Sequence, residues 1–96
     1  MSVRFEWDWS KAAANVRKHN VSFDEASTVF DDPLACIFED EDHSVEEARE
    51  IIIGHSIRGR LLVVAFTERA SDVIRVISAR RASPREREDY EENPYR

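Results

Sequence analysis

The stretch RLLVVAFTE, residues 60–68, decides how the second half of this 96-residue sequence folds. Its six central residues, 61–66, are all apolar. Successive side chains of a strand point to opposite faces, so a strand here carries apolar side chains on both faces. Strands of that kind are covered on both sides. The sequence therefore predicts a central strand at 60–68.

The segments around this strand have a similar composition. Residues 47–57 and 72–80 are rich in Ile and Val, and residues 34–38 form a shorter apolar run. The connectors at 58–59 and 70–71 are short, which favours antiparallel pairing. We therefore expect an antiparallel meander sheet of about four strands.

A first helix is expected before the sheet, because residues 11–18 are good helix formers. Asp8 or Ser10 is a suitable N-cap, and Asn20 suits a left-handed closing residue. Residues 3–7 alternate weakly and are a candidate short edge strand.

Two further helices are indicated by capping boxes. Ser22 and Glu25 have the required spacing, which predicts a short helix over 23–30. The sequence SPRE at 83–86 repeats the pattern with proline at the first helical position, so a last helix should reach about Glu92.

The predicted element order is two N-terminal helices, a meander and one C-terminal helix, so the fold class is α+β, in a single domain over residues 1–96. The longest apolar run has six residues, far short of the ~20 that a bilayer span requires. The only cysteine, Cys36, excludes an internal disulfide. We expect a soluble, cytoplasmic protein without membrane contact.

The net charge of −6 argues against a polyanionic ligand, but the charges are unevenly distributed. Residues 39–50, whose acidic start is a predicted loop, hold seven acidic residues and one arginine. Residues 51–87 hold eight arginines and three acidic residues. The local potential over that half can therefore be positive.

Polar side chains share one stripe of the first predicted helix. Lys11, Asn15 and Lys18 follow at i, i+4 and i+7, and His19 adjoins Asn15. The stripe offers two ammonium groups, an amide and an imidazole to a phosphate. The alternative is an ordinary solvated helix face.

Arginines of the second half are candidate phosphate ligands. Arg75 lies inside an apolar strand, where its guanidinium must line a cleft or pair with Glu50 or Glu68. Further arginines at strand ends are Arg69, Arg80 and Arg81. An odd number of positions separates Arg75 from Arg80, so they point to opposite faces unless a bulge intervenes. We favour Arg80 as catalytic and allow Arg75 to be structural.

Metal and cofactor chemistry is not indicated. The histidines and the cysteine lack metal-ligand spacing, and the two glycines form no phosphate loop. The acidic run at 39–42 leaves a metal-dependent nuclease as an alternative. We expect no metal and no cofactor.

Motifs along nearly the whole chain resemble those of the BrnT family. The opening motif comprises Phe5, Glu6, Trp7, Asp8, Lys11, Asn15, Lys18, His19, Val21, Ser22 and Phe23. The middle comprises Ala26, Val29, Phe30, Asp32, Pro33, His43, Ser44, Glu46, Glu47, Arg49, Ile53 and Gly54. The last part comprises residues 59–64, 67–69, 74–80, 86–87 and 90. The chain departs from the family at Asn20, usually glycine, and at Arg81, often lysine.

The resemblance implies a RelE-like ribonuclease toxin of a type II toxin–antitoxin system that cleaves RNA and arrests growth. It also implies neutralisation by a BrnA antitoxin, a ribbon-helix-helix DNA binder. Operator DNA would then be contacted only through the complex. The competing interpretation is a noncatalytic protein- or DNA-binding module that uses the arginine-rich surface.

Metal-independent RNA cleavage, by attack of the 2′-hydroxyl on the adjacent phosphorus, assigns a role to each candidate. Lys18 and His19 transfer protons, and His19 is the better base because imidazole groups titrate near neutrality. Arg80 stabilises the phosphorane, and Tyr90 protonates the leaving oxygen, as the resemblance to RelE-like toxins implies. Further phosphate contacts are expected from Lys11, Asn15, Arg69, Arg75 and Arg81.

Overall fold

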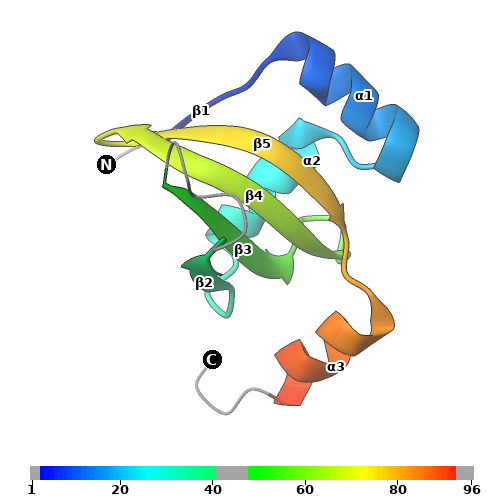
Figure 1. The fold of residues 1–96 in the computed structure, drawn as a ribbon. Coiled ribbons are helices and arrows are strands. Elements are labelled where there is room, and N and C mark those ends of the chain that lie inside the picture. The colour runs from blue at the N-terminus through cyan, green and yellow to red at the C-terminus, as the bar shows by residue number, and fades with distance from the viewer. Residues whose placement is uncertain (1–2, 41–47, 93–96) are drawn as a thin grey trace.

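The computed structural model describes residues 3–40 and 48–92 (Figure 1). These residues form five strands, three α-helices and one 3-10 helix. In chain order they are β1 (Arg4–Glu6), α1 (Trp9–His19), α2 (Phe23–Ser27), η1 (Thr28–Asp31), β2 (Cys36–Glu39), β3 (Arg49–His55), β4 (Leu61–Ala70), β5 (Val73–Arg81) and α3 (Pro84–Glu92). None of the helices formed by these residues is long and apolar enough to cross a lipid bilayer.

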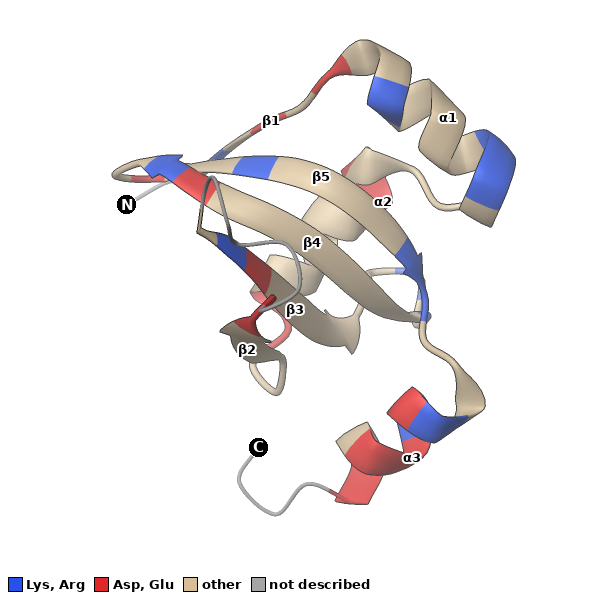
Figure 2. Ribbon diagram, in the orientation of Figure 1, with Lys and Arg blue, Asp and Glu red and all other residues tan. Residues whose placement is uncertain are grey.

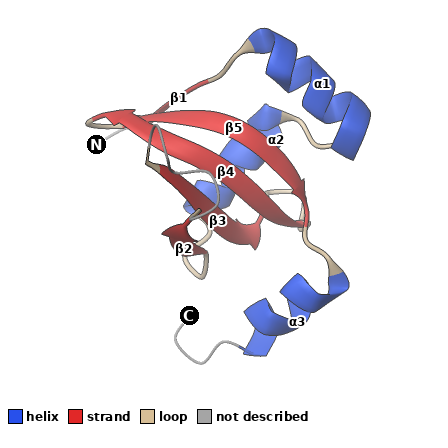
Figure 3. Cartoon of the chain, viewed as in Figure 1, coloured by secondary structure: helices blue, strands red, loops and turns tan. Residues whose placement is uncertain are grey.

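The strands form one sheet in the order β1-β5-β4-β3-β2 (Figure 3). Strands β2 to β5 pair antiparallel, as predicted, whereas β1 pairs parallel with β5. The expected antiparallel sheet of about four strands is therefore corrected to a five-stranded mixed sheet. The residue pattern of a three-residue strand is too short to predict whether the strand pairs parallel or antiparallel. That orientation is set by the direction in which the chain runs along β5.

Side chains and backbone geometry fix both ends of α1 as the sequence predicts. The N-cap is Asp8 rather than Ser10, because an Asp8 carboxylate oxygen accepts the N–H groups of Ser10 and Lys11 at 2.8 and 3.1 Å. Asn20 closes the helix in the left-handed conformation, with φ of 57°. The chain then turns sharply toward α2.

The second helix is shorter than predicted. Helix α2 ends at Ser27, and the chain tightens into η1, so the α-helix expected over 23–30 is wrong at its C-terminal end. Ser22 accepts the Glu25 N–H at 3.0 Å, as a capping residue should. The Glu25 carboxylate, however, is bound by Arg60 and Ser56.

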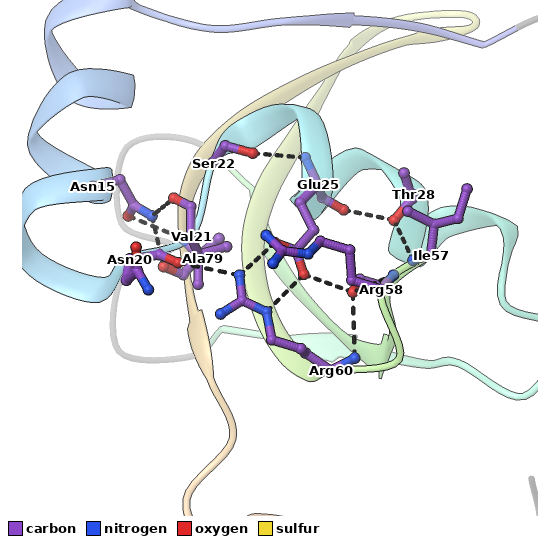
Figure 4. Close-up of polar contacts among 11 residues, drawn as sticks. Asn15, Asn20, Val21, Ser22, Glu25, Thr28, Ile57, Arg58, Arg60 and Ala79 are labelled. Atoms are coloured by element: carbon purple, nitrogen blue, oxygen red, sulfur yellow. Dashed lines mark hydrogen bonds and ion pairs between the residues drawn. The ribbon is translucent and has the colours of Figure 1, made fainter.

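A buried polar network ties α2 to the turn between β3 and β4 (Figure 4). Arg60 binds both carboxylate oxygens of Glu25, and the Ser56 hydroxyl donates to Glu25 at 2.7 Å. Arg60 Nη2, one of the two nitrogens that bind Glu25, also donates to the Asn20 carbonyl at 3.1 Å. These hydrogen bonds, chiefly those from Arg60, outweigh desolvation and lower the pKa of Glu25. The carboxylate is therefore held in its charged form.

The sheet has an apolar layer on each face, and β4 contributes to both. The layer under α1 and α2 comprises Val21, Phe23, Ala26, Val29, Ile52, Leu62, Val64, Phe66, Val76 and Ala79. The layer under α3 comprises Ile53, Leu61, Val63 and Tyr90. This alternation confirms β4 as the predicted strand covered on both sides.

Candidate functional site

Strand β5 contains a β-bulge opposite the middle of β4. Ala65 of β4 faces Ser78 of β5, but the next β4 residue, Phe66, faces Val76. Ile77 is therefore the extra residue of the bulged strand. A bulge of this kind shifts the alternation of side chains by one position.

The bulge brings Arg75 and Arg80 to the same face of the sheet. Arg75 faces Thr67 on β4, and Arg80 faces Val63. Thr67 and Val63 are an even number of residues apart on a regular strand, so they and their partners share one face. Val63 belongs to the apolar layer under α3. We call the side of the sheet with Arg75, Arg80 and α3 the arginine face.

Arg80 is held by the first turn of α3. Two guanidinium nitrogens contact the two carboxylate oxygens of Glu86 at 2.7 and 2.8 Å. Hydrogen bonding with Arg80 lowers the pKa of Glu86 to about 2. Glu86 also accepts the Ser83 N–H at 2.8 Å while Ser83 accepts the Glu86 N–H at 3.1 Å, which completes the predicted capping box.

Arg75 is paired with β1. Its guanidinium donates to the Glu6 carboxylate at 2.9 Å, and both side chains are partly exposed. The partner is therefore neither Glu50 nor Glu68, because the parallel register places Glu6 directly beside Arg75. Figure 2 shows the basic positions along β5 and the acidic positions concentrated on α3.

A groove of about 220 Å³ lies between the sheet and α3. Its walls are apolar on the sheet side and carry two carboxylates on the helix side. The lining residues are Cys36, Phe38, Ile53, Val63, Glu86, Asp89 and Tyr90. Arg80 binds Glu86, which lines this groove, so the Arg80 guanidinium lies next to the groove.

Tyr90 forms the inner side of this groove. Only 6% of the residue is exposed, and its hydroxyl lies 3.2 Å from the Leu34 carbonyl oxygen and 3.4 Å from a carboxylate oxygen of Asp32. The hydroxyl therefore has acceptors within the protein. The predicted role of Tyr90 as a proton donor to substrate stays a prediction.

Asp32 and His55 form a polar pair that is not among the predicted site residues. Asp32 Oδ2 accepts the backbone N–H of His55 at 2.7 Å and lies 3.8 Å from His55 Nδ1. Burial raises the pKa of Asp32, but the backbone N–H groups of His55 and Leu34 outweigh it, and the pKa is lowered. Gly54 leaves room for this carboxylate, because a Cβ there would lie 3.0 Å from Asp32 Oδ2.

Asn15 has a structural task. It is buried and donates to the carbonyls of Val21 and Ala79, both at 2.8 Å, while it accepts the Ala79 N–H at 3.1 Å. The amide thus joins α1 to β5 (Figure 4). A phosphate contact by Asn15 would require these bonds to open.

The other predicted site residues are dispersed. Lys11, Lys18 and His19 are exposed on α1, whose residue Ala12 packs in the layer opposite α3. Arg81 faces Leu62, which also belongs to that opposite layer, and Arg69 is exposed at the end of β4. The structure therefore places Arg75 and Arg80 on one face, Arg80 against α3 and Arg75 against β1, while Lys18 and His19 come from an element across the sheet.

Comparisons with known proteins agree with this architecture. Residues 7–86 match the family model described as ribonuclease toxin, BrnT, of type II toxin–antitoxin system. The structure is similar to the crystal structure of the Brucella abortus ribonuclease toxin BrnT, with a TM-score of 0.66 and 25% sequence identity. That match covers 85% of this chain and 99% of the Brucella chain. No curated protein sequence matches significantly. The chain belongs to the BrnT family of ribonuclease toxins of type II toxin–antitoxin systems.

Proposed function

We propose that this BrnT-family toxin binds RNA across its arginine face and cleaves it without a metal ion. The 2′-hydroxyl attacks the adjacent phosphorus and leaves a 2′,3′-cyclic phosphate and a 5′-hydroxyl. The observation that carries the proposal is the bulge of β5, which directs Arg75 and Arg80 to one face, where Arg80 contacts Glu86 of the groove under α3.

Guanidinium groups suit the charge that develops in this reaction. The phosphorane carries more negative charge than the phosphodiester, and fixed cations stabilise it relative to the ground state. Arg80 has the geometry for the task, because it already holds two carboxylate oxygens in a forked arrangement. In the proposed complex, the RNA phosphate replaces Glu86 on this guanidinium.

The remaining predicted residues keep secondary roles in the proposal. Arg75 contacts a neighbouring phosphate after release from Glu6, and Arg69 and Arg81 add weaker attraction at the strand ends. Lys18 and His19 stay candidates for proton transfer, although their helix packs on the opposite side of the sheet.

The proposed partner is a BrnA-type ribbon-helix-helix antitoxin that neutralises growth arrest. A type II antitoxin is a protein, so the complex must bury toxin surface that RNA would otherwise use or stabilise an inactive toxin. Operator DNA is contacted only through that complex. We keep the RelE-like description of the fold as part of the same proposal.

Cleavage of purified RNA in the presence of EDTA tests the function. The wild-type protein should produce fragments with cyclic-phosphate ends, and Arg80→Ala should lower the rate roughly 10²-fold or more. Arg17→Ala, which removes one exposed cation of α1, is the matched control and should cleave normally. RNA binding without cleavage would support the noncatalytic module instead, and activity lost in EDTA would indicate a metalloenzyme.

A further inference from the structure

Asp32 is a carboxylate held in place beside Tyr90 of the arginine face. One of its oxygens accepts the Leu34 N–H at 2.9 Å, and the other accepts the His55 N–H at 2.7 Å. Its own carbonyl accepts the Ala35 N–H at 3.1 Å. With 12% of its side chain exposed, this carboxylate is a fixed negative charge at the edge of the sheet.

The imidazole of His55 lies between this carboxylate and solvent. Nδ1 is 3.8 Å from Asp32 Oδ2, and the ring meets the Tyr90 ring edge to face at 5.7 Å between centroids. The side chain is 43% exposed, against 12% for Asp32. Nδ1 thus faces the carboxylate, and Nε2, on the other side of the ring, is the nitrogen left for a ligand.

This arrangement is that of a general base with its orienting group. A carboxylate beside Nδ1 favours the tautomer that carries its proton there, so Nε2 has a lone pair to accept a proton. A separation of 3.8 Å is loose for a hydrogen bond, but contacts of this kind often tighten when substrate binds.

His55 and Arg80 lie on the same face and against the same helix. Ile53, Val63 and Arg80 form one row across three strands, and His55 is two residues beyond Ile53. On α3, Glu86 binds Arg80, and Tyr90, four positions later, contacts the His55 ring. Positions i and i+4 are neighbours on one helix face, about 6 Å apart.

The pocket beside His55 selects what can bind there. It has a volume of about 280 Å³ and is lined by Thr28, Asp31, Asp32, His55, Ser56 and Ile57. Two carboxylates repel a phosphate, whereas they accept hydrogen bonds from hydroxyl groups. The pocket, which η1 and the end of β3 form, therefore suits the hydroxyl groups of a ribose.

We infer that His55 is the general base of the reaction and that Asp32 is its positioning residue, an assignment that rests on the proposed ribonuclease function. The proton of the ribose 2′-hydroxyl passes to His55 Nε2, the 2′-oxygen bonds to phosphorus, and the bond from phosphorus to the 5′-oxygen breaks. Water protonates the departing 5′-oxygen in place of Tyr90, whose hydroxyl has acceptors within the protein, and the imidazolium returns its proton to solvent. Arg80 holds the phosphate throughout.

Steady-state cleavage of a mixed-sequence RNA oligonucleotide in EDTA tests the assignment. His55→Gln should lower kcat roughly 10²- to 10⁴-fold. Its affinity for the same oligonucleotide made with 2′-deoxyribose, which cannot be cleaved, should stay within about twofold. Added imidazole should restore part of the activity of His55→Ala, because a free base can occupy the vacated site.

Asp32→Asn tests the positioning role separately. This variant should lower kcat with little change in KM, while Asp24→Asn, at an exposed residue of α2, should match the wild type. If Asp32→Asn instead raises KM and leaves kcat unchanged, Asp32 acts through substrate binding. That result would overturn its role as a positioning residue for His55.

The two proposals fail in different ways. If the wild type cleaves RNA in EDTA and His55→Gln cleaves equally well, the His55 assignment is overturned and the ribonuclease function stands. Loss of activity in His19→Gln alone would move the base to α1. A wild-type protein that binds but never cleaves RNA would overturn both proposals.

Discussion

The side-chain amide of Asn15 pairs with both backbone groups of Ala79, receiving its N–H at 3.1 Å and donating to its carbonyl at 2.8 Å. Strand β1 pairs with β5 only as far as Arg75, so Ala79 lies on a part of the edge that no strand of residues 3–40 and 48–92 covers. Asn15 therefore takes the place of a strand partner. An unpaired strand edge can pair with another chain and cause aggregation. The contact with Asn15 protects this part of the β5 edge.

Asn15→Ala is expected to lower the free energy of unfolding by about 1–3 kcal/mol, because buried backbone groups of Val21 and Ala79 lose their partner. Urea denaturation followed by circular dichroism measures the change. The control is Arg17→Ala on the same helix, which should stay within about 0.5 kcal/mol. Equal stability of both variants would contradict the edge-pairing role.

The ion pair between Arg60 and Glu25 should contribute far more to stability than the neighbouring one. Arg60→Ala leaves Glu25, with 5% of its side chain exposed, without its principal partner, and should cost roughly 3–5 kcal/mol. Arg58→Ala removes a cation that is 69% exposed and 3.7 Å from Glu25, and should cost less than about 1 kcal/mol. Thermal unfolding measures the loss of stability in each variant. A much larger loss in Arg60→Ala is expected from the buried network, and similar losses in both would mean that removal of any positive charge has the same effect.

Gly54 and Gly59 should respond to alanine for different reasons. At Gly54 a Cβ would lie 2.8 Å from the Ala35 Cβ and 3.0 Å from Asp32 Oδ2, so Gly54→Ala must displace the segment that carries Asp32. At Gly59 an added Cβ would meet no atom of the described residues within 4 Å, but φ is +78°. Gly59→Ala should cost only about 1 kcal/mol. Gly54→Ala should destabilise more and also lower RNA cleavage, and a fully active variant would contradict the coupling to Asp32.

Glu86 should contribute to stability in acid. Hydrogen bonding to Arg80 lowers its folded-state pKa to about 2, from its usual 4.5. A lowered pKa stabilises the fold above the unfolded-state value, and this contribution disappears as pH falls from about 4.5 to about 2. The decline of Tm over that range should be less steep in Glu86→Gln. Arg80→Ala should flatten it similarly, because it removes the other half of the pair; an unchanged profile in both would contradict the role of the pair.

The element types followed from local signals. Capping at Asp8, the left-handed residue Asn20 and the capping box of Ser83 with Glu86 lie where the residue types predict, because each depends on atoms within a few positions. The early end of α2 at Ser27 and the bond from Arg60 to Glu25, 35 residues away, had no such local signal.

The candidate site was predictable only in part. Arg80 stood out as an arginine at the end of an apolar strand, but its alignment with Arg75 required the bulge at Ile77, which no residue pattern announced. Asp32 and His55 are 23 positions apart and meet only when the loop after η1 packs against the end of β3.

The sequence by itself determined the strands of the meander, both ends of α1 and the family, since hydrophobic alternation, capping and motifs act through nearby residues. Only the tertiary structure decided which charged groups face each other: the parallel pairing of β1, the shared face of Arg75 and Arg80, and the contact of Asp32 with His55. The physical reason is that register and side-chain direction shift with a single inserted residue, and that shift is fixed by packing across the whole sheet.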